Sequence, residues 1–127
     1  MRKWLLLVLL LACGDDDAGL DLDERRFTLQ SGREPAPGTT PTLTFDEGQL
    51  DFYGGCNSAS GSFSIAGGKL VTKDDFGITE RGCPTPEQSS QDTFYHGFLS
   101  GRPAIALEGS TLTLTIAQVT LTFVEAP

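Results

Sequence analysis

Hydrophobic and polar residues alternate along most of the chain after residue 41. Leu43 and Phe45 alternate with threonines, and Leu50 and Phe52 are followed by Asp51 and Tyr53 in the same rhythm. A period of two is typical of β-strands that bury one face. The pattern predicts strands near residues 27–29, 42–45, 50–53, 62–65, 69–72, 76–78, 105–107, 112–116 and 119–123.

Turn residues separate these runs. Three glycine-containing segments predict hairpin turns at residues 46–48, 66–68 and 108–110. The alternation changes parity between Ile116 and Val119. Neither Ala117 nor Gln118 favours the tight turn of a two-residue hairpin, so we expect a bulge or a shifted turn there.

One segment has a helical pattern instead. Its apolar residues between 94 and 99 repeat at a spacing of four. Thr85 is suited to cap the helix, Pro86 to occupy its first turn, and Gln88 to complete a capping box. We therefore expect one helix over residues 86–99. Together the elements predict an α+β fold, in which a helix covers part of the apolar face of an antiparallel sheet.

The start of the chain is typical of a bacterial lipoprotein precursor. A basic start precedes eight apolar residues, 4–11, which are too few to span a bilayer. Residues 10–13 read LLAC and resemble a lipobox, so Cys13 is expected to become the first mature residue and to carry acyl chains. An ordinary secretory signal and a misassigned start are the alternatives. The chain then divides into a signal peptide (1–12), an acidic tether (13–26) and a domain (27–127).

This start sets the expected location and partners. An acylated Cys13 anchors the protein in the membrane of the cell envelope. Gly14 after the anchor favours the outer membrane facing the periplasm, by analogy with enteric lipoproteins. The 17 acidic residues outnumber the nine basic ones, and two of the nine lie in the signal, so the mature chain carries −10. This charge excludes nucleic acid as an expected partner.

Two cysteines remain beyond the anchor. Cys56 and Cys83 would sit in an oxidising compartment, which favours a disulfide between them. The closed loop of 28 residues would contribute about 3.6 kcal/mol of stability in the chain-entropy model. Two free buried thiols are the alternative.

The segment around Cys56 carries a family resemblance. Residues 54–63 read GGCNSASGSF and resemble the signature of META domains, the family of the heat-shock protein HslJ. Residues 79–84 resemble the family's T-x-x-x-C-P element, and residues 108–114 resemble its closing strand. The front of the chain departs from the family, since Phe27 stands where a tryptophan is usual. The resemblance implies a strongly curved antiparallel sheet, a partly open barrel, packed around one helix, and implies no known enzymatic activity.

The signature also has a structural interpretation. Gly55 permits a positive φ, and Gly61 permits a bulge or bend into the next strand. Asn57 is suited to satisfy backbone groups in a turn, and Ser60 completes the motif. A bridge from Cys56 would pin this hairpin to the start of the helix.

The sequence offers little for catalysis. His96 is the only histidine, so a zinc site with the two cysteines lacks a fourth ligand, and we expect His96 to be an exposed helix residue. Glu80 and Asp92 are candidates for an acid–base pair, but isolated carboxylates are usually solvated. No phosphate loop or dinucleotide motif is present. We expect no enzyme activity, no catalytic residues, no metal and no cofactor.

Two functions compete. The first is a non-catalytic envelope lipoprotein that binds a protein or has a structural or stress-related role. The second is a carrier of a lipid or small apolar ligand. Carriage predicts an apolar cavity lined by Phe45, Phe63, Phe98 and Leu114 rather than a filled core.

Overall fold

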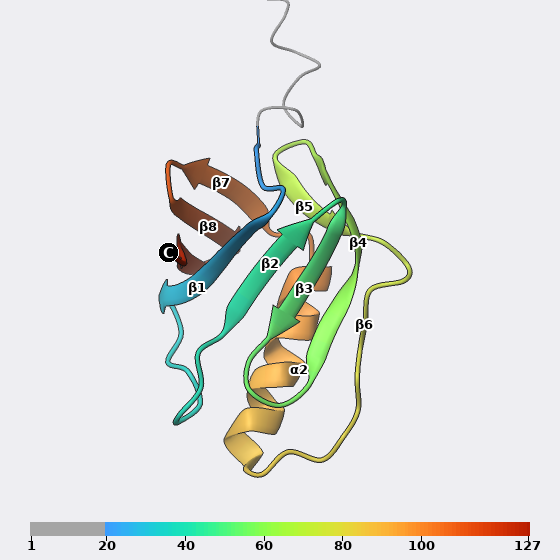
Figure 1. Cartoon of the computed structure of the whole chain (residues 1–127), viewed down its shortest axis with the longest axis vertical. Helices are drawn as coiled ribbons and strands as arrows, with labels where there is room; N and C mark the ends of the chain where they lie inside the picture. The colour runs from blue at the N-terminus through green and yellow to red at the C-terminus, as the bar shows by residue number, and fades with distance from the viewer. Residues whose placement is uncertain (1–19) are drawn as a thin grey trace, which may run out of the picture.

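A computed structural model describes residues 20–127 as a strongly curved sheet with one helix packed against it (Figure 1). The expected strands are all present, and the helix ends one residue beyond the predicted boundary. In chain order the elements are β1 (Arg25–Ser31), β2 (Thr42–Asp46), β3 (Gln49–Tyr53), β4 (Ser58–Ala66), β5 (Lys69–Thr72), β6 (Gly77–Ile78), α2 (Pro86–Ser100), β7 (Ala104–Glu108), β8 (Thr111–Ile116) and β9 (Val119–Glu125).

Eight of the strands form a closed antiparallel barrel. The strand order is β3-β2-β1-β9-β8-β7-β5-β4, and a β3–β4 pairing closes the ring. The short strand β6 pairs with residues 59–60 at the start of β4. The expected partly open barrel is thus closed. The shortest pairing in the barrel is that of β5 with β7, where only Lys69 and Ala104 are paired. Two backbone hydrogen bonds flank this pair, from the Leu70 N–H to the Pro103 carbonyl and from the Ile105 N–H to the Gly68 carbonyl.

The hairpin turns follow the glycine signals, with one exception. Glu47 and Gly48 both have positive φ, at 50° and 79°, as a two-residue type I′ turn requires. The bulge expected at residues 117–118 is absent, because Ala117 adopts a φ of 53° and Ile116 pairs directly with Val119. The register shift lies instead in β1, between Leu29 and Ser31.

The interior of the barrel is filled by apolar side chains. Phe45 and Leu114 are fully buried, Phe98 is nearly so, and Phe63 packs edge-on against Phe45 with ring centroids 5.3 Å apart. These four residues therefore belong to the core and its border. None of them lines any of the clefts described below.

Helix α2 packs its inner face against β4 and β5. The Thr85 hydroxyl accepts a hydrogen bond from the Gln88 backbone N–H, which confirms the predicted cap. The reciprocal half of the capping box is missing, because Gln88 Oε1 has no partner among the described residues. Tyr95 is fully buried and stacks on Phe52 with centroids 4.4 Å apart.

The folded domain begins earlier than predicted. Leu22 is buried in the core and Leu20 packs against its edge, so the expected tether does not extend to residue 26. Two apolar side chains among the acidic residues explain the difference, since each buries apolar surface. Arg25 pairs with Glu125 at 2.8 Å, which joins β1 to β9 and lowers the pKa of Glu125. Among residues 20–127, no helix is both long and apolar enough to cross a bilayer.

The burial of Tyr95 leads to a testable pH dependence. Burial raises the pKa of its phenol to about 12, so the folded state disfavours the phenolate. The resulting stabilisation is complete below the unfolded pKa of about 10 and is lost as the pH rises through about 12. In a Tyr53→Phe variant, where Tyr95 is the only tyrosine, absorbance should show phenolate only above pH 11, together with loss of near-ultraviolet circular dichroism. Ionisation near pH 10 in a folded protein would contradict this expectation.

Candidate functional site

The two cysteines beyond the anchor are joined. A disulfide links Cys56, just before β4, to Cys83, three residues before α2, and their Cα atoms are 5.8 Å apart. The structure thus confirms the predicted bridge, and the alternative of two free thiols is wrong. The bridge ties the turn between β3 and β4 to the start of the helix.

Asn57 ties the same turn to the irregular segment between β6 and α2. Its side-chain Nδ2 donates to the Arg81 carbonyl at 3.0 Å. Its Oδ1 accepts from the Arg81 backbone N–H at 2.9 Å and from the Thr79 hydroxyl at 3.0 Å. The residue is buried, so these bonds replace those that water would supply. The signature asparagine therefore satisfies backbone groups as we expected, but they are those of Arg81, 24 residues away, rather than those of its own turn.

Asp92 holds the helix against the signature. Its side chain is only 3% exposed, and Oδ2 accepts the Asn57 backbone N–H at 3.0 Å. The same oxygen lies 3.4 Å from Cys83 Sγ. Oδ1 is buried without a hydrogen-bond partner among the described residues. Glu80, which we had considered as an acid–base partner of Asp92, is exposed and makes no direct bond to it.

Gln91 makes the matching connection on the other side of the helix. Its Oε1 accepts the Ala36 backbone N–H at 2.8 Å, and its Nε2 donates to the Gly54 carbonyl at 2.9 Å and the Thr39 hydroxyl at 3.1 Å. The side chain is 2% exposed. One buried amide therefore fixes the loop between β1 and β2 to α2.

The remaining signature residues shape the backbone. Gly55 has a φ of 110°, as predicted. Gly61 pairs regularly with Leu50 and forms no bulge. Its importance lies in close approach, because a Cβ there would lie 2.4 Å from Phe76 Cα. Ser60 is exposed on β4.

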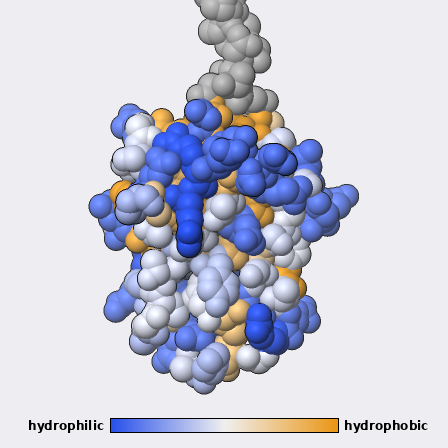
Figure 2. Space-filling view, in the orientation of Figure 1, coloured by the Kyte–Doolittle hydropathy of each residue, from blue (hydrophilic) through white to orange (hydrophobic). Residues whose placement is uncertain are grey.

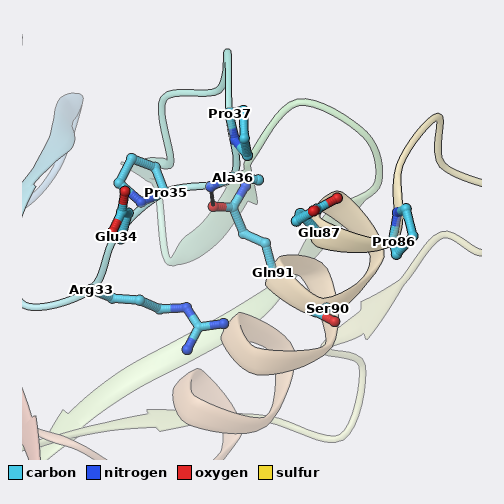
Figure 3. A pocket seen from close by; sticks show the side chains of 9 residues that line it. All are labelled: Arg33, Glu34, Pro35, Ala36, Pro37, Pro86, Glu87, Ser90 and Gln91. Carbon is cyan, nitrogen blue, oxygen red and sulfur yellow. Dashed lines mark hydrogen bonds between the residues drawn. The ribbon is translucent and has the colours of Figure 1, made fainter.

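A cleft opens between the β1–β2 loop and the start of α2. Its volume is about 460 Å³. Figure 3 shows Gln91 reaching from the helix to Ala36, with the Arg33 side chain extending below the loop toward the helix. Arg33 covers the ring of Phe94 at 3.9 Å from its centroid, a cation–π contact. Three prolines complete much of the wall: Pro35, Pro37 and Pro86.

Two further clefts adjoin this one along the helix. The second cleft shares Ser90 with the first. The third cleft shares Ser89 and Thr93 with the second. We call the combined area the α2 surface; it comprises residues 33–37, Asn57, residues 78–80 and the lining residues of α2 between 86 and 94. A separate cleft of about 560 Å³ lies around residues 71–75. The face seen in Figure 2 is largely hydrophilic with scattered apolar spots. That face therefore shows no broad apolar patch as an alternative binding surface.

The comparison with known families agrees with this architecture. The META domain profile matches residues 20–127. The chain belongs to the META domain family. The match begins at Leu20, where the described fold also begins, and so includes the front of the chain with Phe27 in β1.

Solved structures share the META fold. A protein from Burkholderia xenovorans, determined by NMR, superposes with a TM-score of 0.66 at 24% identity over 83% of each chain. A second protein determined by NMR gives 0.65 at 26% identity over 81% of this chain and 90% of that one. No curated protein matches the chain.

Among the described residues, His96 joins no cluster of carboxylate or thiol groups that could hold a metal ion. His96 is half-buried rather than exposed, and stacks on Phe76 with centroids 5.6 Å apart. The two sulfurs considered with it as zinc ligands are bonded to each other. Among the described residues, Cys56 and Cys83 do cluster with Asp92, and a second acidic cluster of Asp23, Glu24 and Asp46 is fully exposed. The expectations of no enzyme activity and no metal stay predictions.

The sequence pattern did not identify the two polar residues that position α2, Gln91 and Asp92. Gln91 and Asp92 precede Tyr95 by four and three residues, so the spacing alone places them on its buried face. Their polarity instead suggested exposure. From the sequence, Asp92 is a candidate only for one half of an acid–base pair, whereas its carboxylate bonds the signature turn.

Asn57 provides a test of this network. Asn57→Ala removes three side-chain hydrogen bonds, each worth about 0.5–1.5 kcal/mol, and should lower the free energy of unfolding by about 2–4 kcal/mol. Urea denaturation measures the change. The matched control is Ser60→Ala, an exposed residue of the same signature, for which we expect a change within about 0.5 kcal/mol. Equal effects of the two substitutions would show that the network contributes no special stability.

Proposed function

We propose that this META protein is a non-catalytic lipoprotein of the cell envelope, and that it binds a protein partner through the α2 surface. The observation that carries the proposal is the grouping of concave surface. Three of the four clefts described above adjoin one another around the first half of a single helix. Protein partners use such surfaces when a rigid scaffold presents them.

The α2 surface is held in place from both sides. Gln91 fastens the loop that forms one wall, and Asn57 with Asp92 fastens the segment that forms the other. The disulfide limits the movement of that second segment. A surface ordered before binding loses less conformational entropy on association, which favours affinity.

The filled barrel favours binding outside over carriage inside. The four residues that a carrier would use to line a cavity pack within the core or at its border. A lipid would have to displace these contacts, and lost core packing is costly. No observation in the described residues specifically favours the carrier hypothesis.

The proposed anchor would leave the α2 surface accessible to a partner. Cys13 lies outside the described residues, seven positions before Leu20 in the sequence. At about 3.5 Å per residue, the connection spans at most about 25 Å. Figure 1 shows the described chain beginning at one end of the long axis and α2 beginning at the other. An anchored domain would thus present the start of α2 away from the membrane.

The anchor can be tested directly. The exported protein should fractionate with membranes and have the mass of residues 13–127 plus acyl chains on Cys13. Cys13→Ser should abolish both acylation and membrane fractionation, because serine provides no thiol for the lipid. Wild-type protein recovered soluble and unacylated, with an N-terminus other than Cys13, would overturn the lipoprotein part of the proposal.

The α2 surface can be tested by site-specific photocrosslinking in intact envelopes. A photoreactive residue at exposed Ser90 should give a discrete adduct, whereas the same residue at exposed Ala106, on β7, should not. Adding Thr93→Arg, which places a bulky charge on the surface, should abolish the adduct without altering the fold.

The controls distinguish a specific surface from general proximity. Circular dichroism verifies the fold of each variant. Equal adducts from Ser90 and Ala106, or an adduct that Thr93→Arg leaves unchanged, would show that the partner does not use the α2 surface.

A further inference from the structure

One cleft of the α2 surface is lined by a residue whose buried carboxylate keeps one oxygen without a hydrogen-bond partner among the described residues. The cleft has a volume of about 280 Å³ and lies between α2 and the segment after β6. Asp92 belongs to its lining, although the residue is only 3% exposed. Its Oδ2 serves the Asn57 N–H at 3.0 Å, while Oδ1 has no hydrogen-bond donor among the described residues.

The surroundings select the type of group that would complete this site. Glu80 adds a second, exposed carboxylate, and no lysine, arginine or histidine lines the cleft. Hydroxyl groups of Thr79, Ser89 and Thr93 supply further polar contacts. A buried acceptor beside an uncompensated acidic wall favours a ligand that brings both hydrogen-bond donors and positive charge.

Size and ligand spacing favour an organic cation over a metal ion. A volume of about 280 Å³ is just below the usual range for small-molecule pockets, and is suited to one side chain. Among the described residues, Glu80 belongs to no group of three or more carboxylate, thiol or imidazole ligands that could surround an ion together. Calcium and magnesium need several oxygen ligands at close range.

We infer that this cleft receives the cationic side chain, lysine or arginine, of the protein partner. The inference rests on the proposed binding function and specifies the chemistry of the partner at one point of the α2 surface. The ammonium or guanidinium group pairs with the exposed Glu80, and it donates to Asp92 Oδ1 when the buried carboxylate turns toward the cleft, while its alkyl stem lies along Ile78. The net negative charge of the chain attracts such a partner.

Small cations provide the test. The full mature chain, with Cys13→Ser for solubility, is titrated with n-butylammonium and n-propylguanidinium chloride and followed by amide NMR. Saturable shifts are expected at Thr79 and Glu80 and at the Asn57 side-chain amide. The neutral isostere 1-butanol and an equal ionic strength of sodium chloride should not produce them. Saturable shifts from magnesium chloride at the same residues would overturn the assignment to an organic cation.

Two substitutions and one matched control locate the site. Glu80→Gln removes an exposed charge and should weaken binding of n-butylammonium by about two- to fivefold, the size of effect expected for an exposed ion pair. Asp92→Asn keeps the side-chain shape and should abolish saturable binding, with the fold verified by thermal melting. Asp74→Asn removes an exposed acid from the separate cleft and should leave binding unchanged. Equal responses of Glu80→Gln and Asp74→Asn would reduce the effect to general charge attraction and sink the inference.

The outcomes separate the two proposals. Loss of cation binding with the Ser90 adduct retained would remove only the side-chain site. Cation binding without any adduct would instead overturn the proposed partner surface. If both hold, adding Glu80→Gln to the crosslinking protein should reduce its adduct.

Discussion

The hydrogen bond from the Asn57 backbone to Asp92 is the contact on which the rest of the site depends. It joins the signature turn to the middle of α2, next to the sulfur of Cys83. The helix has no comparable polar contact to β7, β8 or β9 among the described residues, so its position relative to the barrel depends on this side. Moving Asp92 would also move the wall formed by residues 78–80, because Asn57 bonds both.

Local pattern was enough to predict most of the fold. Each hairpin glycine and each alternating run acts within a few residues, so the strands and the helix were foreseeable from spacing alone. The disulfide followed from the count of cysteines and the expected compartment. Barrel closure was not foreseeable in this way, because the β1–β9 and β5–β7 pairings join strands that are far apart in the sequence and depend on the accumulated twist of the whole sheet. At residue 117 an alanine with positive φ replaced the expected bulge.

The site was less predictable than the fold, for a related reason. Gln91 and Asp92 look like surface residues of a helix, and their roles appear only when a loop 55 residues away and a turn 35 residues away pack against them. Residues 33–37 carry no periodic signal, since prolines and charges predict only a loop. The buried side-chain amide of Gln91 holds this loop in place as one wall of the cleft, and no local sequence pattern reveals that contact.

The chemistry of the interior explains why function is sought outside the barrel. Apolar side chains fill the space that a carrier would leave open, and the buried polar groups gather at the edge of the core, beside α2. A carboxylate in that position is unfavourable unless its oxygens are satisfied, and the fold satisfies only one of them. An apolar residue of similar volume would satisfy packing there. The acid instead makes one contact that sets the helix, to the Asn57 backbone, and the donor that we propose for its second oxygen would come from the partner.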